Sequence, residues 1–356
     1  MQIDRRDLLT LAAASAVAWP CRLAAATMAV PAVDRLELTI LIDSTTAVFG
    51  TPIDTPLIKV TPPPITRDYH QAFAGQWGYS LLARSSVGAA ARATLVDFGY
   101  TPEALLNNMT LLGVDPATVD AMVLSHGHYD HFGGLDGLLA NGRIRRGTPL
   151  FVGGEEAFCA RIRGTESGGP PFGAVDRAAL LRAGVVPVIS GDPKIVTGQG
   201  FTTGRIPFVS PERPRVPTAM LPGQGCDRVL LDPAKRDASF LVDDAVHELG
   251  TAYHVAGRGL VVIGSCSHRG IINTVRQAQA VSGIAKVHAI IGGFHLVPPQ
   301  TAAQAQETVA LMQAIDPDVI VPGHCSGETF IAAAQATMPG KVIRSIVGTR
   351  YLFGQP

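Results

Sequence analysis

Short apolar runs alternate with longer Ala-rich segments along the chain beyond residue 33. The short runs are bounded by turn residues and are rich in β-branched side chains, which is typical of buried strands. They predict strands over 36–42, 80–83, 93–98, 121–124, 149–152, 186–189, 260–264, 287–291 and 319–321. The longer segments space their apolar residues at helical intervals and predict helices over 102–112, 271–281, 302–314 and 328–336. Strands and helices that alternate in this way indicate a layered α/β fold.

One stretch, 191–236, interrupts the alternation, because it is rich in Pro, Gly and Arg and shows little periodicity. We expect it to be a long loop or an insertion within a single domain that spans 33–356. Loops of that length in compact domains are often functional.

The first 29 residues have the pattern of an export signal, which we expect to be cleaved and not to be part of the fold. Arg5 and Arg6 precede a short apolar run over 11–19, which ends at Pro20 and is followed by Ala-rich sequence. The adjacent arginines resemble a twin-arginine leader, which implies recognition of the precursor by the export machinery. We therefore expect a mature protein that begins near Ala29 and is periplasmic or otherwise exported.

Composition and charge exclude some functional classes, in particular nucleic-acid-binding proteins. The chain has 356 residues, of which 47% are hydrophobic and 16% charged, so it can bury a large core. Lys plus Arg and Asp plus Glu both number 29, so no strong electrostatic field would attract nucleic acid. We expect a small-molecule substrate and no nucleic-acid partner.

The five cysteines are far apart along the chain and form no paired pattern. Cys21 lies where a lipoprotein cysteine would lie, but the residues before it are not the small ones that lipidation usually needs. The others are Cys159, Cys226, Cys266 and Cys325. Four cysteines in a chain of this length are not a disulfide framework, although a single disulfide in an oxidising compartment stays open.

The densest group of chemically active residues is Ser-His-Gly-His-Tyr-Asp-His over 125–131. Buried imidazoles and carboxylates each need hydrogen-bond partners, so such a cluster is costly to place for packing alone. His126 and His128 are two residues apart in an extended turn, so they point the same way and can hold one divalent ion. Asp130 and His131, on the following turn, can face a second ion.

This H-x-H-x-D-H pattern resembles the motif of the metallo-β-lactamase superfamily at every position. The resemblance implies a four-layer αββα sandwich with a one- or two-metal site at one edge of the paired sheets. It also implies that Asp97, at a predicted strand end, anchors the metal-binding loop through hydrogen bonds. His324, in Val-Pro-Gly-His-Cys over 321–325, matches the last metal motif and is the expected distal ligand.

The resemblance leaves one ligand position open. The segment 264–270 matches the fourth motif, where an Asp or a Cys normally lies; here Cys266 occupies that place and His268 lies two residues further on. We expect His268 to be the ligand, because imidazole suits both Zn and Fe, and Cys266 is the alternative. The third motif has no match, because His247 and His254 lie in the right interval but outside the usual turn. His268 can fill that vacancy.

Three segments, 264–270, 292–296 and 321–325, are similar to a narrower branch, the dihydropterin aminobenzene phosphate synthase-like proteins. His295 follows a predicted strand end, and we expect it to line the pocket as a proton donor or substrate contact. A histidine that only supports the ligands is the alternative. Trp77 replaces a His that branch members commonly carry.

Together these residues predict a metal-dependent hydrolase. One or two divalent ions, Zn first and Fe or Mn as alternatives, would lower the pKa of a bound water from about 15.7 toward about 7. The resulting hydroxide, oriented by Asp130, would attack an ester, lactone, lactam or phosphoester. Arg269, or an Arg within 205–215, could bind an anionic substrate group. The alternatives are a condensing synthase of the dihydropterin branch and a metal-binding protein that has lost catalysis.

Overall fold

The computed structural model describes residues 27–164, 169–213 and 216–354. The expected twin-arginine segment and Cys21 lie outside these ranges, so the export signal stays a prediction. Within the described ranges, no helix is long and apolar enough to cross a membrane.

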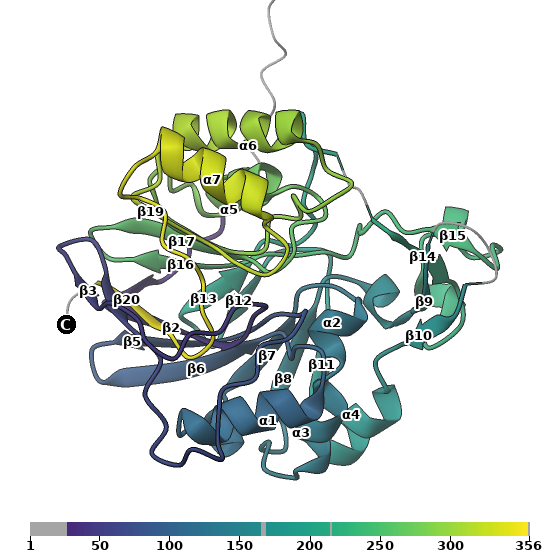
Figure 1. The fold of residues 1–356 in the computed structure, drawn as a ribbon. Helices are drawn as coiled ribbons and strands as arrows, with labels where there is room; N and C mark the ends of the chain where they lie inside the picture. The colour runs from purple at the N-terminus through teal and green to yellow at the C-terminus, as the bar shows by residue number, and fades with distance from the viewer. Residues whose placement is uncertain (1–26, 165–168, 214–215, 355–356) are drawn as a thin grey trace, which may run out of the picture.

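Two β-sheets face each other and helices cover the outer face of each, so the chain forms four layers (Figure 1). This arrangement confirms the predicted αββα sandwich. One sheet has nine strands in the order β11 (Val186–Ile189), β8 (Pro149–Val152), β7 (Ala121–Leu124), β6 (Ala90–Val96), β5 (Ser80–Val87), β2 (Arg35–Ile42), β20 (Arg350–Gly354), β4 (Lys59–Thr61) and β3 (Ile53–Asp54). The facing seven-stranded sheet has the order β12 (Lys194–Val196), β13 (Gly200–Thr202), β16 (Thr251–Val255), β17 (Gly259–Gly264), β18 (Val287–Gly292) and β19 (Val319–Pro322), with β1 (Ala32–Val33) paired to β16.

A small third sheet lies beside the sandwich, on the right in Figure 1. Its order is β10 (Pro171–Gly173), β9 (Ala160–Arg163), β14 (Thr218–Leu221) and β15 (Leu241–Val242). Because it lies outside the two main layers, it can form a wall over one edge of the sandwich.

The helices divide between the two outer faces. Those beside the nine-stranded sheet are α1 (Pro102–Leu111), α3 (Leu135–Ala140) and α4 (Arg177–Ala183), and those beside the seven-stranded sheet are α5 (Ile271–Ser282), α6 (Ala302–Ile315) and α7 (Glu328–Thr337). The short helix α2 (Tyr129–Phe132) lies in the predicted metal-binding loop. Single turns of 3₁₀ helix occur at η1 (Pro116–Thr118), η2 (Glu155–Phe158), η3 (Arg228–Leu230) and η4 (Pro233–Lys235).

Apolar side chains fill the three spaces between the four layers. Successive residues of a strand point to opposite faces, so β7 directs Met122 toward the helices and Val123 toward the facing sheet. In the same way β18 directs Ile290 toward its helices and Ile291 between the sheets. These strands are apolar on both faces because both faces are buried.

The strands and helices predicted from periodicity are all present, with ends that differ by a few residues. Of the two expectations for 191–236, a long loop or an insertion, the loop is wrong in part, since this stretch contains β12, β13 and β14. These strands are three or four residues long, and a run that short shows no measurable alternation. β13 and β14 are stabilised as strands by pairing with β16 and β9, which lie far away in the sequence, and β12 pairs with its neighbour β13.

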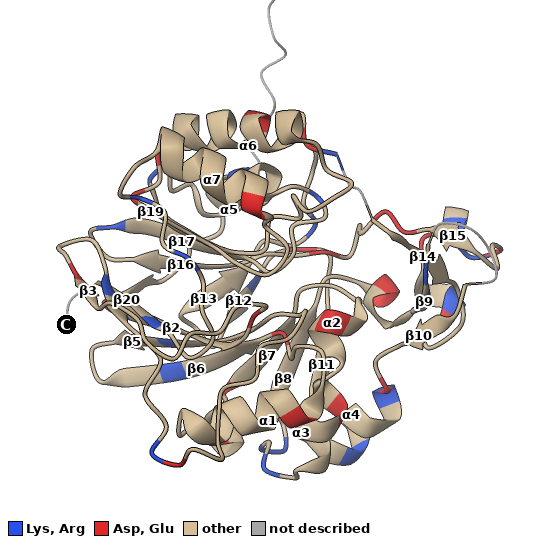
Figure 2. Ribbon diagram, in the orientation of Figure 1, with Lys and Arg blue, Asp and Glu red and all other residues tan. Residues whose placement is uncertain are grey.

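The parallel pairs bring several strand ends to one edge of the sandwich. β6 runs parallel to β7, and β17, β18 and β19 run parallel to one another. The carboxyl ends of parallel strands meet at the same edge, where loops build ligand sites. Figure 2 shows Lys and Arg interspersed with Asp and Glu over helices and loops, in keeping with the formal net charge of zero.

Candidate metal centre

Asp97, directly after β6, holds the loop that follows β7. Its carboxylate accepts hydrogen bonds of 2.7 Å from the backbone N–H of Ser125, from the Ser125 hydroxyl and from Nδ1 of His131. The residue is fully buried, and its φ of 56° lies in the left-handed region that side chains other than glycine rarely adopt. A carboxylate that orients an imidazole in this way fixes the ring for a metal on its other side.

The first ligand group consists of His126, His128 and His268. One ring nitrogen from each lies within 4.8 Å of the others, and the Nε2 atoms of His126 and His268 are 3.2 Å apart. Burial lowers the pKa of His126 and His268 well below the ordinary imidazole value, and it also lowers the pKa of His128. The three rings are therefore neutral near pH 7, which is the form that binds a metal.

The second ligand group consists of Asp130, His131 and His324. Oδ2 of Asp130 lies 3.7 Å from Nε2 of His131 and 3.4 Å from Nε2 of His324. Burial by itself would raise the pKa of Asp130, but His131 and His324 more than offset it and hold that pKa below its ordinary value. This group therefore presents an ionised carboxylate beside two imidazoles.

Both groups fit a divalent ion. Among the described residues, the buried Nε2 of His131, which faces Asp130, has no hydrogen-bond partner. A buried polar atom without a partner costs about 1–3 kcal/mol, and a metal bond supplies a partner for a nitrogen lone pair. His126, His128 and His268 would hold one ion, and Asp130, His131 and His324 a second.

Two carboxylates that the sequence analysis missed hold the turns that carry His324 and His268. Asp43, directly after β2, accepts hydrogen bonds from the Ser345 hydroxyl at 2.6 Å and from the His324 backbone N–H at 2.8 Å. Glu248 accepts from the backbone N–H groups of His268 at 2.8 Å and Arg269 at 2.7 Å. Asp43 resembles Asp97 in following an apolar strand, and that signal could have found it.

Cys266 and His295 also reach the centre. Sγ of Cys266 lies 3.5 Å from Nδ1 of His295, 3.8 Å from Nε2 of His324 and 3.3 Å from Sγ of Cys325. The rings of His268 and His295 are 4.2 Å apart between centroids. The structure thus brings together both residues of the open ligand position, Cys266 and His268, and places His268 with the first pair of histidines.

Residues 86–324 match the family profile described as the metallo-beta-lactamase superfamily. The chain belongs to this superfamily. It is 28% identical over 290 residues to a "7,8-dihydropterin-6-methyl-4-(beta-D-ribofuranosyl)-aminobenzene-5'-phosphate synthase" of Methanocaldococcus jannaschii, a match that covers 78% of this chain and 92% of the synthase. An uncharacterised protein of the same organism is 26% identical over 231 residues, which cover 64% of this chain and 76% of that protein.

Among solved structures, the fold is similar to that of Tm1679, a metal-dependent hydrolase of the beta-lactamase superfamily. The TM-score is 0.65 at 20% sequence identity, and the match covers 88% of this chain and 98% of the other. At that identity the likeness supports the fold, and membership of the superfamily in turn implies divalent metal binding.

His247, a candidate for the third superfamily motif, lies behind the metal-binding loop. Its Nε2 accepts a 3.1 Å hydrogen bond from the backbone N–H of Gly127, and the Arg161 guanidinium lies 3.0 Å from the same nitrogen. His254 lies on β16, half-buried in the sheet. Neither histidine joins the ligand groups, which agrees with the mismatch of both to the expected turn.

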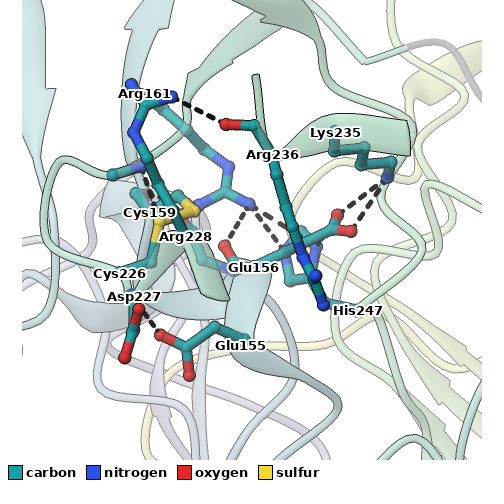
Figure 3. The surroundings of a disulfide bond; sticks show 12 residues. Glu155, Glu156, Cys159, Arg161, Cys226, Asp227, Arg228, Lys235, Arg236 and His247 are labelled. Carbon is teal, nitrogen blue, oxygen red and sulfur yellow. Dashed lines mark hydrogen bonds and ion pairs between the residues drawn. A yellow bond between two sulfur atoms is a disulfide. The ribbon is translucent and has the colours of Figure 1, made fainter. Parts of the chain in front are cut away.

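Arg161, on β9, ties the third sheet to the metal-binding loop. Its guanidinium is fully buried and donates to Asp243 and to the carbonyl of Gly127 at 3.1 Å. It also donates to the carbonyl of Glu156 at 2.9 Å (Figure 3). Asp243 Oδ2 in turn lies 3.6 Å from Nε2 of His128. A buried Arg–Asp pair therefore supports the first ligand group, and no local sequence signal marked it.

A disulfide joins Cys159 and Cys226, which are 67 residues apart in sequence (Figure 3). It links the start of β9 to the loop that follows β14. The single disulfide that the sequence analysis left open is thus present in the structure, at the base of the third sheet.

The ligand groups open into a cavity of about 1050 Å³. The third sheet and its loops supply one wall, including Phe172 and Thr218, and Trp77 packs with its ring centroid 5.0 Å from that of His324. Arg163 also lines the cavity. Arg269 does not serve as the expected anion contact there, because its guanidinium donates to backbone carbonyls and stacks on Phe208.

Proposed function

We propose that this superfamily member is a metal-dependent hydrolase that acts on an ester, lactone, lactam or phosphoester of a small molecule. The observation that carries the proposal is that both ligand groups lie at one cavity. A divalent ion held there lowers the pKa of its bound water toward about 7 and so supplies a nucleophile at neutral pH.

Side chains of the protein then orient the attacking water and donate a proton. Asp130, ionised and next to His131 and His324, is placed to accept a hydrogen bond and so to orient the attacking water. His295, on the same cavity wall, is placed to donate a proton to the leaving group. Aromatic side chains, among them Trp77, Tyr100 and Phe172, line the same cavity.

Arg163 brings a guanidinium to the cavity, and we propose it as the contact for an anionic substrate group. It lies on β9, two residues from the buried Arg161, so the third sheet that supports the first ligand group would also bind the substrate.

A condensing synthase is the second candidate function. The similarity to the M. jannaschii synthase over 92% of its length favours it, and the name of that relative contains three ring systems (pterin, benzene and ribofuranose) and a phosphate. A cavity of about 1050 Å³ is at the upper end of the range for small-molecule sites and is large enough for such a molecule.

The deciding experiment measures metal content and products together. Protein loaded with Zn, Fe or Mn is assayed on a panel of esters, lactones, lactams and phosphodiesters in isotopically labelled water, with chelated protein and Asp130→Asn as controls. A hydrolase incorporates one labelled oxygen into product and loses activity on chelation. A product that joins two substrates without label supports the synthase, and tight metal retention with no turnover supports a binding protein.

We also propose that the precursor is exported by the twin-arginine route to the periplasm. The Cys159–Cys226 disulfide supports this, because disulfides persist in oxidising compartments and are rare in the cytosol. The variant Arg5→Lys with Arg6→Lys should leave the precursor in the cytoplasm, as measured by cell fractionation and by its molecular mass. Normal periplasmic levels of that variant would argue against this route.

A further inference from the structure

We propose that Cys266 and Cys325, together with His324, form a thiolate-bearing metal position that adjoins Asp130 and His131. The inference rests on the proposed function in one respect, namely that the cavity holds metal ions. It adds Cys325, which no sequence motif marked as a ligand, and it specifies the chemical class of the second ion.

The geometry brings the two sulfurs together from separate loops. Sγ of Cys266 and Sγ of Cys325 are 3.3 Å apart, and these two atoms and a ring nitrogen of His324 all lie within 4.8 Å of one another. One ion could bond to all three after small side-chain movements, since metal–sulfur bonds are about 2.3 Å long.

The backbone is shaped to allow this approach. Cys266 follows β17 and Cys325 follows β19, and the intervening strand β18 ends at Gly292. A Cβ on the next residue, Gly293, would lie 2.7 Å from the Cys325 sulfur and 2.6 Å from the Ser265 carbonyl, so only glycine fits between the two cysteine loops. The backbone N–H of His295 donates to Cys325 Sγ at 3.3 Å, as it would to a thiolate.

The surroundings of the sulfurs differ from those of cysteines that serve only to fill a core. Both are buried, yet Cys266 Sγ contacts ring nitrogens of His295 and His324, and both cysteines line the metal cavity. A buried cysteine in a core packs against apolar atoms instead. The pair is also not a disulfide, because 3.3 Å is well beyond the about 2.05 Å of a sulfur–sulfur bond.

Two thiolates determine which ions the position prefers. Soft sulfur ligands select Zn, Fe or Cu(I) over Mg, Ca or Mn. When a divalent ion binds, each sulfur–metal bond replaces an S–H bond, and the two protons released go to the buffer. We therefore expect the second position to favour a thiophilic ion.

Cobalt(II) substitution tests the proposal, because a sulfur–cobalt bond gives a near-ultraviolet charge-transfer band that an imidazole or carboxylate does not give. The full chain is stripped of metal and titrated with Co(II) in the absence of oxygen. The wild type should show the band, Cys266→Ser and Cys325→Ser should each weaken it, and the double variant should abolish it. His126→Ala with His128→Ala is the matched control, which should lose one ion and keep the band.

A second measurement needs no variant. Metal-loaded and metal-free wild-type protein are treated with an alkylating reagent, and modification of Cys266 and Cys325 is read by peptide mass spectrometry. Metal should protect both residues. If Cys325→Ser does not fold, as judged by circular dichroism, this protection and the Cys325→Ala variant still decide the question.

Three results would overturn the proposal: a wild type that binds two cobalt ions without the band, equal alkylation with and without metal, or a Cys266–Cys325 disulfide in the metal-loaded protein. The band reports a bond and not turnover, so the two proposals fail separately. A band without hydrolysis would contradict the proposed function alone, and metal-dependent hydrolysis without the band would contradict the thiolate position alone.

Discussion

The two ligand groups differ in charge and in how the fold supports them. The first, His126, His128 and His268, consists of imidazoles kept neutral by burial. The second contains the ionised carboxylate of Asp130 and lies against two cysteine sulfurs. Asp243 supports the first group from the third sheet, whereas Asp97 supports both groups, through His131 directly and through Ser125 to His126.

This difference teaches that one short motif can supply two chemically distinct positions. A group of neutral imidazoles suits several borderline metals, whereas carboxylate plus sulfur adds negative charge and softness. We expect the first position to retain its ion when a ligand of the second is removed, because the two groups share no residue.

The largest expected effect comes from removing the first group. His126→Ala with His128→Ala should eliminate one ion and all turnover, since two of three ligands disappear. Elemental analysis and the hydrolysis assay measure this, with His70→Ala as the control because that ring is exposed. Unchanged metal content in the double variant would contradict the assignment of His126 and His128 as metal ligands.

Asp130→Asn addresses the second group alone. Removing the carboxylate's charge should release the second ion, retain the first and reduce kcat by about 10²- to 10⁴-fold, the range for a lost proton-transfer group. Metal stoichiometry and kcat are measured on the same preparation. A variant that keeps both ions and full activity would show that Asp130 has no role in the second position.

The role of His268 as a metal ligand is tested by comparing it with His247, a buried histidine on the other side of the metal-binding loop. His268→Ala should weaken the first ion by more than about 100-fold, because it removes a direct ligand, whereas even residues that only support a ligand cost about 10- to 100-fold. His247→Ala should stay within that lower range, since its ring contacts Gly127 and Arg161. Competition titration with a chelator gives both affinities, and the reverse order would exchange the two roles.

The supporting carboxylates should separate the groups with smaller effects. Asp97→Asn should weaken the second ion about 10- to 100-fold, because His131 loses the partner that orients its ring, and it should weaken the first ion less, because Asp97 reaches His126 only through Ser125. Asp243→Asn should weaken the first ion by a similar factor, because Asp243 lies beside His128. Equal weakening of both ions by each variant would show that the two groups act as one unit.

Asp243→Asn should also destabilise the fold, since it leaves the buried Arg161 guanidinium without its counter-charge. Breaking a buried ion pair costs about 3–5 kcal/mol. The control Asp54→Asn breaks the exposed pair with Lys59 and should cost about 0–1 kcal/mol. Urea unfolding of the metal-free protein measures both, and equal costs would contradict a structural role for the Arg161–Asp243 pair.

Local patterns in the sequence determined much of this protein. Apolar periodicity located the long strands and helices, because a strand buried on both faces or a helix packed on a sheet must be apolar at regular intervals. The H-x-H-x-D-H motif located four of the site residues, since ligands on one short loop carry their spacing with them. His295 and His324 were found because each follows a strand whose end could be predicted.

Tertiary structure alone decided how distant segments meet. His268 joins His126 across 142 residues, and Cys159 joins Cys226 across 67, distances over which sequence spacing carries no geometric information. The Arg161–Asp243 pair left no sequence signal, because a buried charge pair resembles two surface charges until the chain folds. The short strands β13 and β14 were missed for the same reason: pairing with distant strands stabilises them, and their own three or four residues do not.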